Sequence, residues 1–270
     1  MCGITGIIDA HAPQQLRLMT QMLVHRGPDD GAVWTMEGAG LGHRRLSILD
    51  WSEDARQPMA SEDGRYVLSF NGEIFNYREL REQLEGQGHA FRSRSDTEVL
   101  LHACIAWGDT VVDRLVGQFA FALWDVRERR LLLARDHLGI KPLYIAEQEG
   151  ALYFASEAKA IAAVLPATRT VREELLPQYL AFLWVPGEET LFQGIRKLLP
   201  GSIAVYHEGA LRIRRYWDPI ETWKSAGPAR PSPAERDEEF RMLLRQSVRS
   251  QLMSDVPLGL LLSGGIDSTI

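Results

Sequence analysis

The 270-residue sequence has few cysteines, no long apolar run and no strong excess of basic residues. Its two cysteines cannot build a disulfide framework, and no Cys/His cluster has the spacing of a zinc site. A net charge of −6 argues against a nucleic-acid binder, because phosphate contacts require clustered Lys and Arg. No run approaches the roughly 18 apolar residues that span a bilayer, and the start lacks the basic and apolar regions of a signal peptide. We expect a cytoplasmic protein that contacts neither membrane nor nucleic acid.

The composition is that of an ordinary globular protein, with 45% hydrophobic and 24% charged residues. At roughly 150 residues per domain, the length predicts about two domains. Up to residue 217, short strands and helices alternate, mostly through turns of hairpin length, which predicts an α+β fold with antiparallel sheets. We expect strands at 3–8, 32–36, 40–48, 66–70, 119–125, 131–135, 143–146 and 152–155, and helices at 14–25, 76–83 and 99–107.

Short polar signals mark two of these helices and one strand. Asn76 with Glu79, and Ser95 with Glu98, have the spacing of a capping box, in which the first side chain accepts a hydrogen bond at the helix N-terminus. Asn71-Gly72 follows an expected strand and indicates a turn.

The composition changes at Asp218. Residues 218–233 contain four prolines and predict a linker, which separates a first domain at 2–217 from a second at 234–270. Residues 234–251 have the pattern of a charged amphipathic helix, and the continuous apolar run at 256–262 predicts a buried parallel strand. The chain stops soon after this run, so we expect a truncated product or a fragment of a longer chain.

Cys2 directly follows the initiator methionine, and its small side chain favours removal of Met1. The thiol and a free α-amine would then belong to one residue. An α-amine has a reference pKa of about 7.7–8.0, so it can accept the thiol proton near neutral pH. The alternative interpretation is that position 2 is a cysteine by chance and has no chemical role. Cys104, by contrast, lies within an expected helix among apolar residues and is expected to be a buried structural thiol.

The second chemical motif is Ser-Gly-Gly-x-Asp-Ser at 263–268, after the apolar run. Successive backbone N–H groups at such a turn form a nest for anions, and a following helix would add positive potential. The motif lacks the lysine of a Walker-type loop. The alternative interpretation is a flexible Ser-Gly-Gly linker.

Several motifs together carry a family resemblance. Cys2-Gly3-Ile4-Thr5-Gly6 resembles the start of class II glutamine amidotransferases, whose N-terminal domain releases ammonia from glutamine. Further motifs in the same order make nearly the whole chain similar to glutamine-dependent asparagine synthetases: His25-Arg26-Gly27-Pro28-Asp29, Gly42-His43-Arg44-Arg45-Leu46-Ser47-Ile48, Asn71-Gly72-Glu73-Ile74, Ser95-Asp96-Thr97-Glu98, Ala134-Arg135-Asp136 with Gly139 and Lys141-Pro142-Leu143-Tyr144, and Ser263 to Ser268.

The resemblance implies both a fold and a reaction. The fold would be the αββα sandwich of an N-terminal-nucleophile hydrolase with two antiparallel sheets, followed by the beginning of an α/β ATP-pyrophosphatase domain. The first domain would hydrolyse glutamine to glutamate and ammonia. The complete second domain would use this ammonia to convert aspartate and ATP into asparagine, AMP and pyrophosphate, and only the glutaminase reaction is expected of this chain.

Hydrolysis of glutamine requires a nucleophile, a base, donors to an oxyanion and a site for an amino acid. Cys2 and its amine supply the first two, and the Asn71 side chain and the Gly72 backbone N–H supply oxyanion donors. A guanidinium can bind the substrate carboxylate bidentately, which favours Arg45, while Asp96, with help from Glu73, would bind the α-ammonium. The resemblance implies the same roles and adds the backbone of Leu46, Ser47, Ile48 and Leu49.

Each assignment has a structural alternative. Asn71-Gly72 could be a plain hairpin turn, Arg45 a solvated surface charge, and Asp96 a charge favoured by the helix dipole. Arg44 is taken as solvated. Arg26 and Asp29 are expected near the site without a stated role, a lone His43 is expected to be structural, and residues 135–144 are assigned no chemistry.

For the second motif, the resemblance implies an ATP site at Leu262, Ser263, Gly264, Gly265, Asp267 and Ser268. Mg²⁺ is implied with ATP, although no ligand set is visible apart from possible help from Asp267, and no cofactor is expected for the first domain. A homodimer is plausible by family analogy. The alternatives are another carboxylate acceptor in a biosynthetic cluster, or an inactive assembly module.

Overall fold

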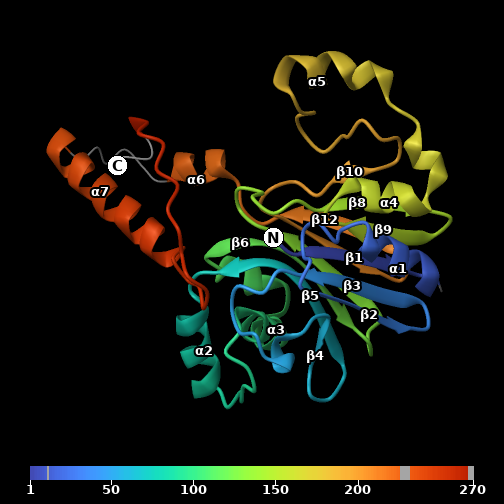
Figure 1. Ribbon diagram of the computed structural model, residues 1–270, viewed down its shortest axis with the longest axis horizontal. Helices are drawn as coiled ribbons and strands as arrows, with labels where there is room; N and C mark the ends of the chain where they lie inside the picture. The colour runs from blue at the N-terminus through green and yellow to red at the C-terminus, as the bar shows by residue number, and fades with distance from the viewer. Residues whose placement is uncertain (11, 226–231, 267–270) are drawn as a thin grey trace.

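Two six-stranded antiparallel sheets form the centre of the computed structural model, which describes residues 1–10, 12–225 and 232–266 (Figure 1). The first sheet has the strand order β10-β8-β9-β1-β3-β2 and the second the order β12-β11-β7-β6-β5-β4. The first contains β1 (Gly3–Ile8), β2 (Asp30–Met36), β3 (Ala39–Arg45), β8 (Tyr144–Gln148), β9 (Ala151–Ala155) and β10 (Arg196–Lys197). The second contains β4 (Met59–Ala60), β5 (Tyr66–Ile74), β6 (Gly117–Asp125), β7 (Arg130–Arg135), β11 (Ser202–His207) and β12 (Ala210–Arg215).

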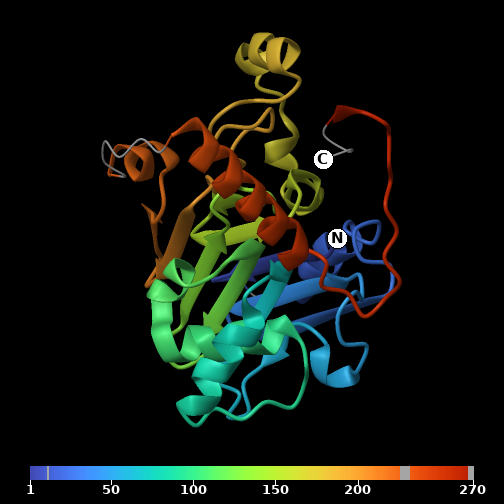
Figure 2. The ribbon, with the colours of Figure 1, turned by 90° about the vertical axis from the view of Figure 1, so that its left-hand side faces the viewer.

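Helices cover the outer face of each sheet. On the first sheet lie α1 (Pro13–Gln21) and α4 (Ala158–Val164), whose side chains pack into one core cluster. On the second lie α2 (Tyr77–Gly86) and α3 (Asp96–Trp107), whose side chains form another. A third cluster fills the space between the sheets. The expected αββα arrangement is thereby confirmed (Figures 1 and 2).

The sequence of β1 explains its central place. All six of its residues are buried, because both faces of its sheet are covered. Side chains alternate between the faces of a strand, so Ile4 and Ile8 contribute to the cluster between the sheets, whereas Ile7 packs in the cluster beneath α1. A Cβ at Gly6 would lie 2.1 Å from the Phe154 ring, so this glycine admits a core side chain rather than a substrate.

Two hydrogen bonds join the sheets beside the start of β1. The buried ring of His43 on β3 contacts the carbonyl of Phe70 on β5 through Nε2 at 3.0 Å, and the Ser69 hydroxyl donates to the Gly42 carbonyl at 3.0 Å. Burial lowers the pKa of His43 to about 4, so the ring is neutral and Nε2 carries the proton that it donates to the carbonyl. The structural role expected for His43 is confirmed.

The turn expected at Asn71-Gly72 is wrong, because both residues lie within β5. This strand pairs with β6 without interruption, from Tyr66 opposite Asp125 to Ile74 opposite Gly117. At Gly72 a Cβ would lie 2.3 Å from the carbonyl oxygen of Gln118 on β6. Glycine is therefore needed here for close strand approach rather than for a turn.

The helix starts agree with the sequence only in part. The side chain of Asn76 does not cap α2, since it bonds the Arg114 carbonyl and the Val116 N–H instead. Ser95 does cap α3, because its hydroxyl accepts from the Glu98 N–H. The first helix also ends earlier than expected, at Gln21, and turns follow it to residue 26.

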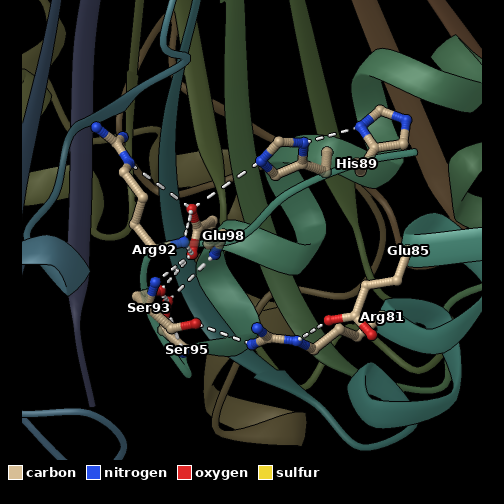
Figure 3. A network of polar contacts seen from close by, with 8 residues as sticks. Arg81, Glu85, His89, Arg92, Ser93, Ser95 and Glu98 are labelled. Carbon is tan, nitrogen blue, oxygen red and sulfur yellow. Dashed lines mark hydrogen bonds and ion pairs between the residues drawn. The ribbon is translucent and has the colours of Figure 1, made fainter. Parts of the chain in front are cut away.

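The first turn of α3 is held by the network around Glu98 in Figure 3. The Glu98 carboxylate is almost fully buried and accepts hydrogen bonds from the backbone of Arg92 and from the backbone and hydroxyl of Ser93. The Ser93 hydroxyl also bonds the Ser95 hydroxyl at 2.8 Å. Glu98 therefore braces the preceding loop rather than completing a capping box.

Beyond residue 217 the structure differs from the sequence-based expectation. The segment expected as a linker contains α6 (Pro219–Ser225), while residues 226–231 lie outside the described part. The expected helix is present as α7 (Pro233–Ser250). Residues 256–262 form no strand and are mostly exposed, Leu261 by 96%. A parallel strand is stable only between neighbours that pair with it, and no described strand lies beside this segment.

The described residues also contain the short helix α5 (Leu176–Phe182) and 3₁₀ turns at Glu53–Ala55, Gly108–Asp113, Pro166–Arg169 and Glu173–Leu175. Among the described residues, no helix has both the length and the apolar character needed to cross a membrane.

We predict that Ser95→Ala lowers the free energy of unfolding by about 1–2 kcal/mol. The substitution removes the cap of α3 and leaves the buried Ser93 hydroxyl and Glu98 N–H without the Ser95 oxygen as a partner. The matched control is Ser232→Ala, which removes the cap of the exposed helix α7 and should change global stability by less than about 0.5 kcal/mol. Urea denaturation of both variants measures the difference. Equal losses would contradict the role given to the α3 cap.

Candidate active site

A pocket opens where the start of β1, the end of β3, the middle of β5 and the start of α3 meet. Its walls come from Met1 and Cys2, from the chain at Arg45–Leu49 and from the turn at Ala55–Gln57. The opposite wall comes from Phe70–Glu73, the first turn of α3 and Lys141. The residues that line it are Met1, Cys2, Arg45, Leu46, Ile48, Leu49, Ala55, Gln57, Phe70, Asn71, Gly72, Glu73, Ser95, Asp96, Thr97 and Lys141.

The fold brings nearly all of the residues predicted for a glutamine site into this one pocket. They come from four separate stretches of sequence, and only Ser47 is missing from the lining. Its backbone N–H instead donates to the carboxylate of Asp29 at 2.8 Å. Asp29, which was expected nearby without a role, therefore holds the loop that follows β3.

Cys2, directly before the first residue of β1, is held in place by contacts with backbone atoms. Its Sγ lies 3.4 Å from the Leu46 nitrogen, which donates to it, and 3.7 Å from the Leu46 carbonyl. The guanidinium of Arg26 donates to the Cys2 carbonyl at 2.8 Å and is itself paired with Glu157 at 3.0 Å. Arg26 thus fixes the backbone of Cys2, which gives a role to a residue that the sequence placed only nearby.

Burial raises the pKa of the Cys2 thiol and outweighs the hydrogen bond from Leu46 that favours the thiolate. The thiol in this environment therefore needs a base to react near neutral pH. In the chain that begins with Met1, the free amine belongs to Met1, and its pKa is lowered by burial.

Asn71 supplies an unpaired amide in the wall of the pocket. Its side chain is only 1% exposed, yet neither Oδ1 nor Nδ2 has a hydrogen-bond partner among the described residues. A buried polar group without a partner costs about 1–3 kcal/mol. A ligand oxygen that accepts a hydrogen bond from Nδ2 would relieve part of this cost.

The backbone of β5 adds a donor beside Asn71. In an antiparallel strand, the N–H groups of alternate residues point to the same side. The N–H of Phe70 donates to Gln57 at 2.7 Å and that of Ile74 to Asp96 at 3.0 Å, both away from β6. The N–H of Gly72, which lies between them, therefore also points away from β6 and toward the pocket.

The cationic end of the pocket is the buried guanidinium of Arg45. It donates to the carbonyls of Leu49 and Ser52 at 3.3 and 3.5 Å, and also to the carbonyl of Asp50. The loop after β3 therefore wraps around this side chain and orients it. Arg44 beside it is half-buried and donates to the Gly27 carbonyl, so the expectation that it is simply solvated is wrong.

The acidic end contains Asp96 and Glu73. Burial raises the pKa of Asp96 to about 7, and the nearby Glu73 carboxylate acts in the same direction, although the Ile74 N–H opposes it. Burial also raises the pKa of Glu73, against the attraction of Lys141. These acids lie across the same pocket as Arg45, so the site offers opposite charges to a zwitterion.

Seven residues that line the pocket were not predicted for the glutamine site, namely Met1, Ala55, Gln57, Phe70, Ser95, Thr97 and Lys141. Lys141 is 6% exposed, and burial lowers its pKa while Glu73 opposes that shift. Its motif was noted but was given no chemistry, and only the turn around Asp136, which accepts the Lys141 N–H, carries it to the pocket. Gln57 bonds Thr97 at 3.2 Å, a pairing that no sequence pattern signals.

The residues predicted to bind ATP are not part of this pocket. Leu262, Ser263, Gly264 and Gly265 are exposed, Leu262 by 65%, while Asp267 and Ser268 lie outside the described residues. The described part of the loop thus forms no enclosed cradle for a nucleotide. Within the described ranges, no group of three or more His, Cys, Asp or Glu side chains could hold a metal ion.

Comparisons with known proteins agree with this geometry. Residues 1–217 match a family model described as "Glutamine amidotransferase domain", and residues 239–270 match one described as "Asparagine synthase". Asparagine synthetase [glutamine-hydrolyzing] 1 of Bacillus subtilis is 39% identical over all of this chain and 43% of its own length. Asparagine synthetase B [glutamine-hydrolyzing] of Escherichia coli is 36% identical over all of this chain and 44% of its length. The chain therefore spans less than half the length of these relatives.

Solved structures resemble the fold. Glutamine phosphoribosylpyrophosphate amidotransferase of B. subtilis, in complex with ADP and GMP, aligns with a TM-score of 0.61 and 23% identity, over 80% of this chain and 49% of that one. This likeness supports the two-sheet α+β architecture. Because the glutamine amidotransferase model matches 217 of the 270 residues, beginning at Met1, the chain belongs to the glutamine amidotransferase domain family.

Proposed function

We propose that this pocket hydrolyses the side-chain amide of glutamine, with Cys2 as the nucleophile. The observation that carries the proposal is the unpaired, buried amide of Asn71 in the same pocket as the Cys2 thiol, between Arg45 and Asp96. A pocket with a nucleophile, oxyanion donors and opposite charges suits an amino acid that carries a carboxamide.

The reaction begins once removal of Met1 makes Cys2 the first residue. The α-amine of Cys2 takes the thiol proton, and Sγ attacks the carboxamide carbon of glutamine. The developing oxyanion is stabilised by the Asn71 side-chain amide and the Gly72 N–H, and one such donor is worth about 3 kcal/mol of barrier. The amine returns the proton to the leaving nitrogen, so ammonia departs and a thioester forms. Water, activated by the same amine, cleaves the thioester to glutamate and the free thiol.

Recognition of the amino-acid end follows from charge. Arg45 would bind the α-carboxylate, with the loop carbonyls around its guanidinium setting the direction of its remaining donors. Asp96 and Glu73 would bind the α-ammonium. Glutamate carries an additional negative charge on its side-chain carboxylate. At that end the pocket presents the Cys2 thiol, whose pKa is raised, and the neutral amide of Asn71. The neutral carboxamide of glutamine is therefore the better fit.

For the whole protein, we propose that the ammonia amidates an ATP-activated carboxylate, with aspartate as the acceptor. The names of the most similar relatives and the match of residues 239–270 support this acceptor over another carboxylate. ATP with Mg²⁺ would be the co-substrate of that second reaction.

We predict that Cys2→Ala abolishes glutamate release, with a loss of at least about 10³-fold in kcat, because no other thiol lines the pocket. Cys104→Ala is the matched control. Its thiol is buried in the α3 core cluster, and glutamate release should stay within about twofold of native. Enzymatic quantitation of glutamate measures both, and an active Cys2→Ala protein would disprove the assignment of the nucleophile.

A second prediction concerns the N-terminus. Protein beginning at Cys2 should release glutamate at least about 100-fold faster than protein that retains Met1, because a peptide nitrogen cannot serve as the base. The two forms can be prepared by proteolytic release of a tag and by blocking methionine removal, and mass spectrometry verifies each N-terminus. Equal rates would exclude the α-amine as the base.

A third prediction follows from the pKa of about 7 at Asp96. Above this pH the carboxylate is ionised and attracts the substrate ammonium; as the pH falls through 7 it is protonated and the attraction is lost. The Kd of glutamine should therefore rise toward tenfold per pH unit below 7. Calorimetry on the Cys2→Ala variant separates this binding from turnover. Asp96→Asn should bind more weakly at pH 8 and with a flat profile from pH 6 to 8; a native-like slope in that variant would contradict the assignment.

A further inference from the structure

The chain after α7 returns to the loop that orients Arg45. At Asp255 the backbone N–H donates to the carbonyl of Ile48 at 3.1 Å, and one carboxylate oxygen accepts from the N–H of Asp50 at 2.8 Å. These two hydrogen bonds join residues about 205 positions apart in sequence. Figure 2 shows this part of the chain leaving the lower end of α7 and running outside the two sheets.

Asp50 is the residue on which the loop after β3 turns. Its carbonyl accepts from the Arg45 guanidinium, and its carboxylate accepts from the backbone N–H groups of Ser52 and Arg94 at 2.9 and 2.7 Å. Its φ of +48° places it in the left-handed region, which is unfavourable for a residue with a side chain. External contacts must therefore hold Asp50 in place, and Asp255 supplies the partner for its N–H.

The segment that carries Asp255 is anchored on its other side as well. Met253, two residues earlier, packs against the core cluster formed with α2 and α3. After Val256 the chain is exposed up to Ile266. Residues 253–255 thus bridge the helical layer and the pocket loop, and they lie within residues 239–270, the part that matches the asparagine synthase model.

We propose that Asp255 is a positioning residue for glutamine recognition, which acts through Asp50 on Arg45. The proposal rests on the proposed function, since it assigns the α-carboxylate of glutamine to Arg45. It makes the carboxylate end of the pocket depend on a segment within the second part of the chain. A displacement of that segment releases Asp50, lets the loop relax and misdirects the guanidinium, so substrate affinity falls while the Cys2 chemistry is unchanged.

The exposed guanidinium of Arg78 also lies near Asp255, so a charge effect must be separated from the hydrogen bond. An asparagine at 255 keeps an acceptor oxygen for the Asp50 N–H and loses the charge, whereas an alanine loses both. The pair Asp255→Asn and Asp255→Ala therefore isolates the hydrogen bond. Asp237→Asn is the matched control, because it removes one exposed carboxylate on α7 that makes no contact with the loop.

The experiment uses the chain beginning at Cys2 and measures glutamine hydrolysis together with amide hydrogen exchange of the peptide that contains Asp50. We expect Asp255→Ala to raise KM for glutamine three- to tenfold with kcat within twofold of native, and to speed exchange at Asp50. Asp255→Asn and Asp237→Asn should remain within twofold of native in KM, with unchanged exchange.

Each other outcome counts against a definite claim. An unchanged KM in a folded Asp255→Ala protein overturns the positioning role, whether or not exchange at Asp50 changes. A KM raised equally by Asp255→Asn shows that charge, and not the hydrogen bond, is responsible, which also overturns it. If the native chain releases no glutamate at all, the proposed function itself fails.

Discussion

The hydrogen bonds between the two sheets are the constraint on which the site depends. β1 pairs with β3 in one sheet, and Cys2 stands at the head of β1. Asn71 and Gly72 lie on β5 in the other sheet. The bonds from His43 to the Phe70 carbonyl and from Ser69 to the Gly42 carbonyl join β3 to β5 next to these residues. They hold Cys2 beside one sheet in place relative to Asn71 and Gly72 on the other. Because burial keeps His43 neutral, this link does not titrate in the neutral range.

The alternation of N–H groups along a β-strand sets the next part of the site. Along β5, the side of the strand that faces away from β6 presents an N–H at Phe70, Gly72 and Ile74. The outer two are occupied, by Gln57 and Asp96, so only the middle one is left for a ligand. The same bond that occupies Ile74 places the Asp96 carboxylate at the pocket. The network around Glu98 in turn holds the first turn of α3 in which Asp96 lies (Figure 3). One strand thereby sets the Gly72 N–H and the Asp96 carboxylate at a fixed separation.

The sequence predicted the short, strongly patterned parts of this arrangement well. β1 has the bounds that its apolar run predicts, and the motif residues Cys2, Arg45, Asn71 and Asp96 meet in one pocket. The sequence-based prediction failed where pairing with a distant strand overrides a local signal. The Asn-Gly pair indicates a turn, yet the pairing of β5 with β6 keeps Asn71 in a strand. The apolar run at 256–262 predicts a strand, but strands require partners that the described residues do not provide. Lys141 was missed because the turn around Asp136 that carries it to the pocket is itself placed by hydrogen bonds to the distant Phe119.

The pocket concentrates groups that are unfavourable in a folded chain. The Asn71 amide has no partner among the described residues, burial raises the pKa of Asp96 to about 7, and burial lowers the pKa of Lys141. Each of these costs must be offset by the three apolar clusters around the sheets. All of them are carried by strands, by a capped helix or by a tightly bonded turn, which restricts their relaxation. Arg45 differs, because its direction is set by a loop whose hub, Asp50, relies on single hydrogen bonds to distant segments. The ends of the pocket at Asp96 and at Asn71 are therefore held by secondary structure, whereas the end at Arg45 depends on a loop that contacts Asp255.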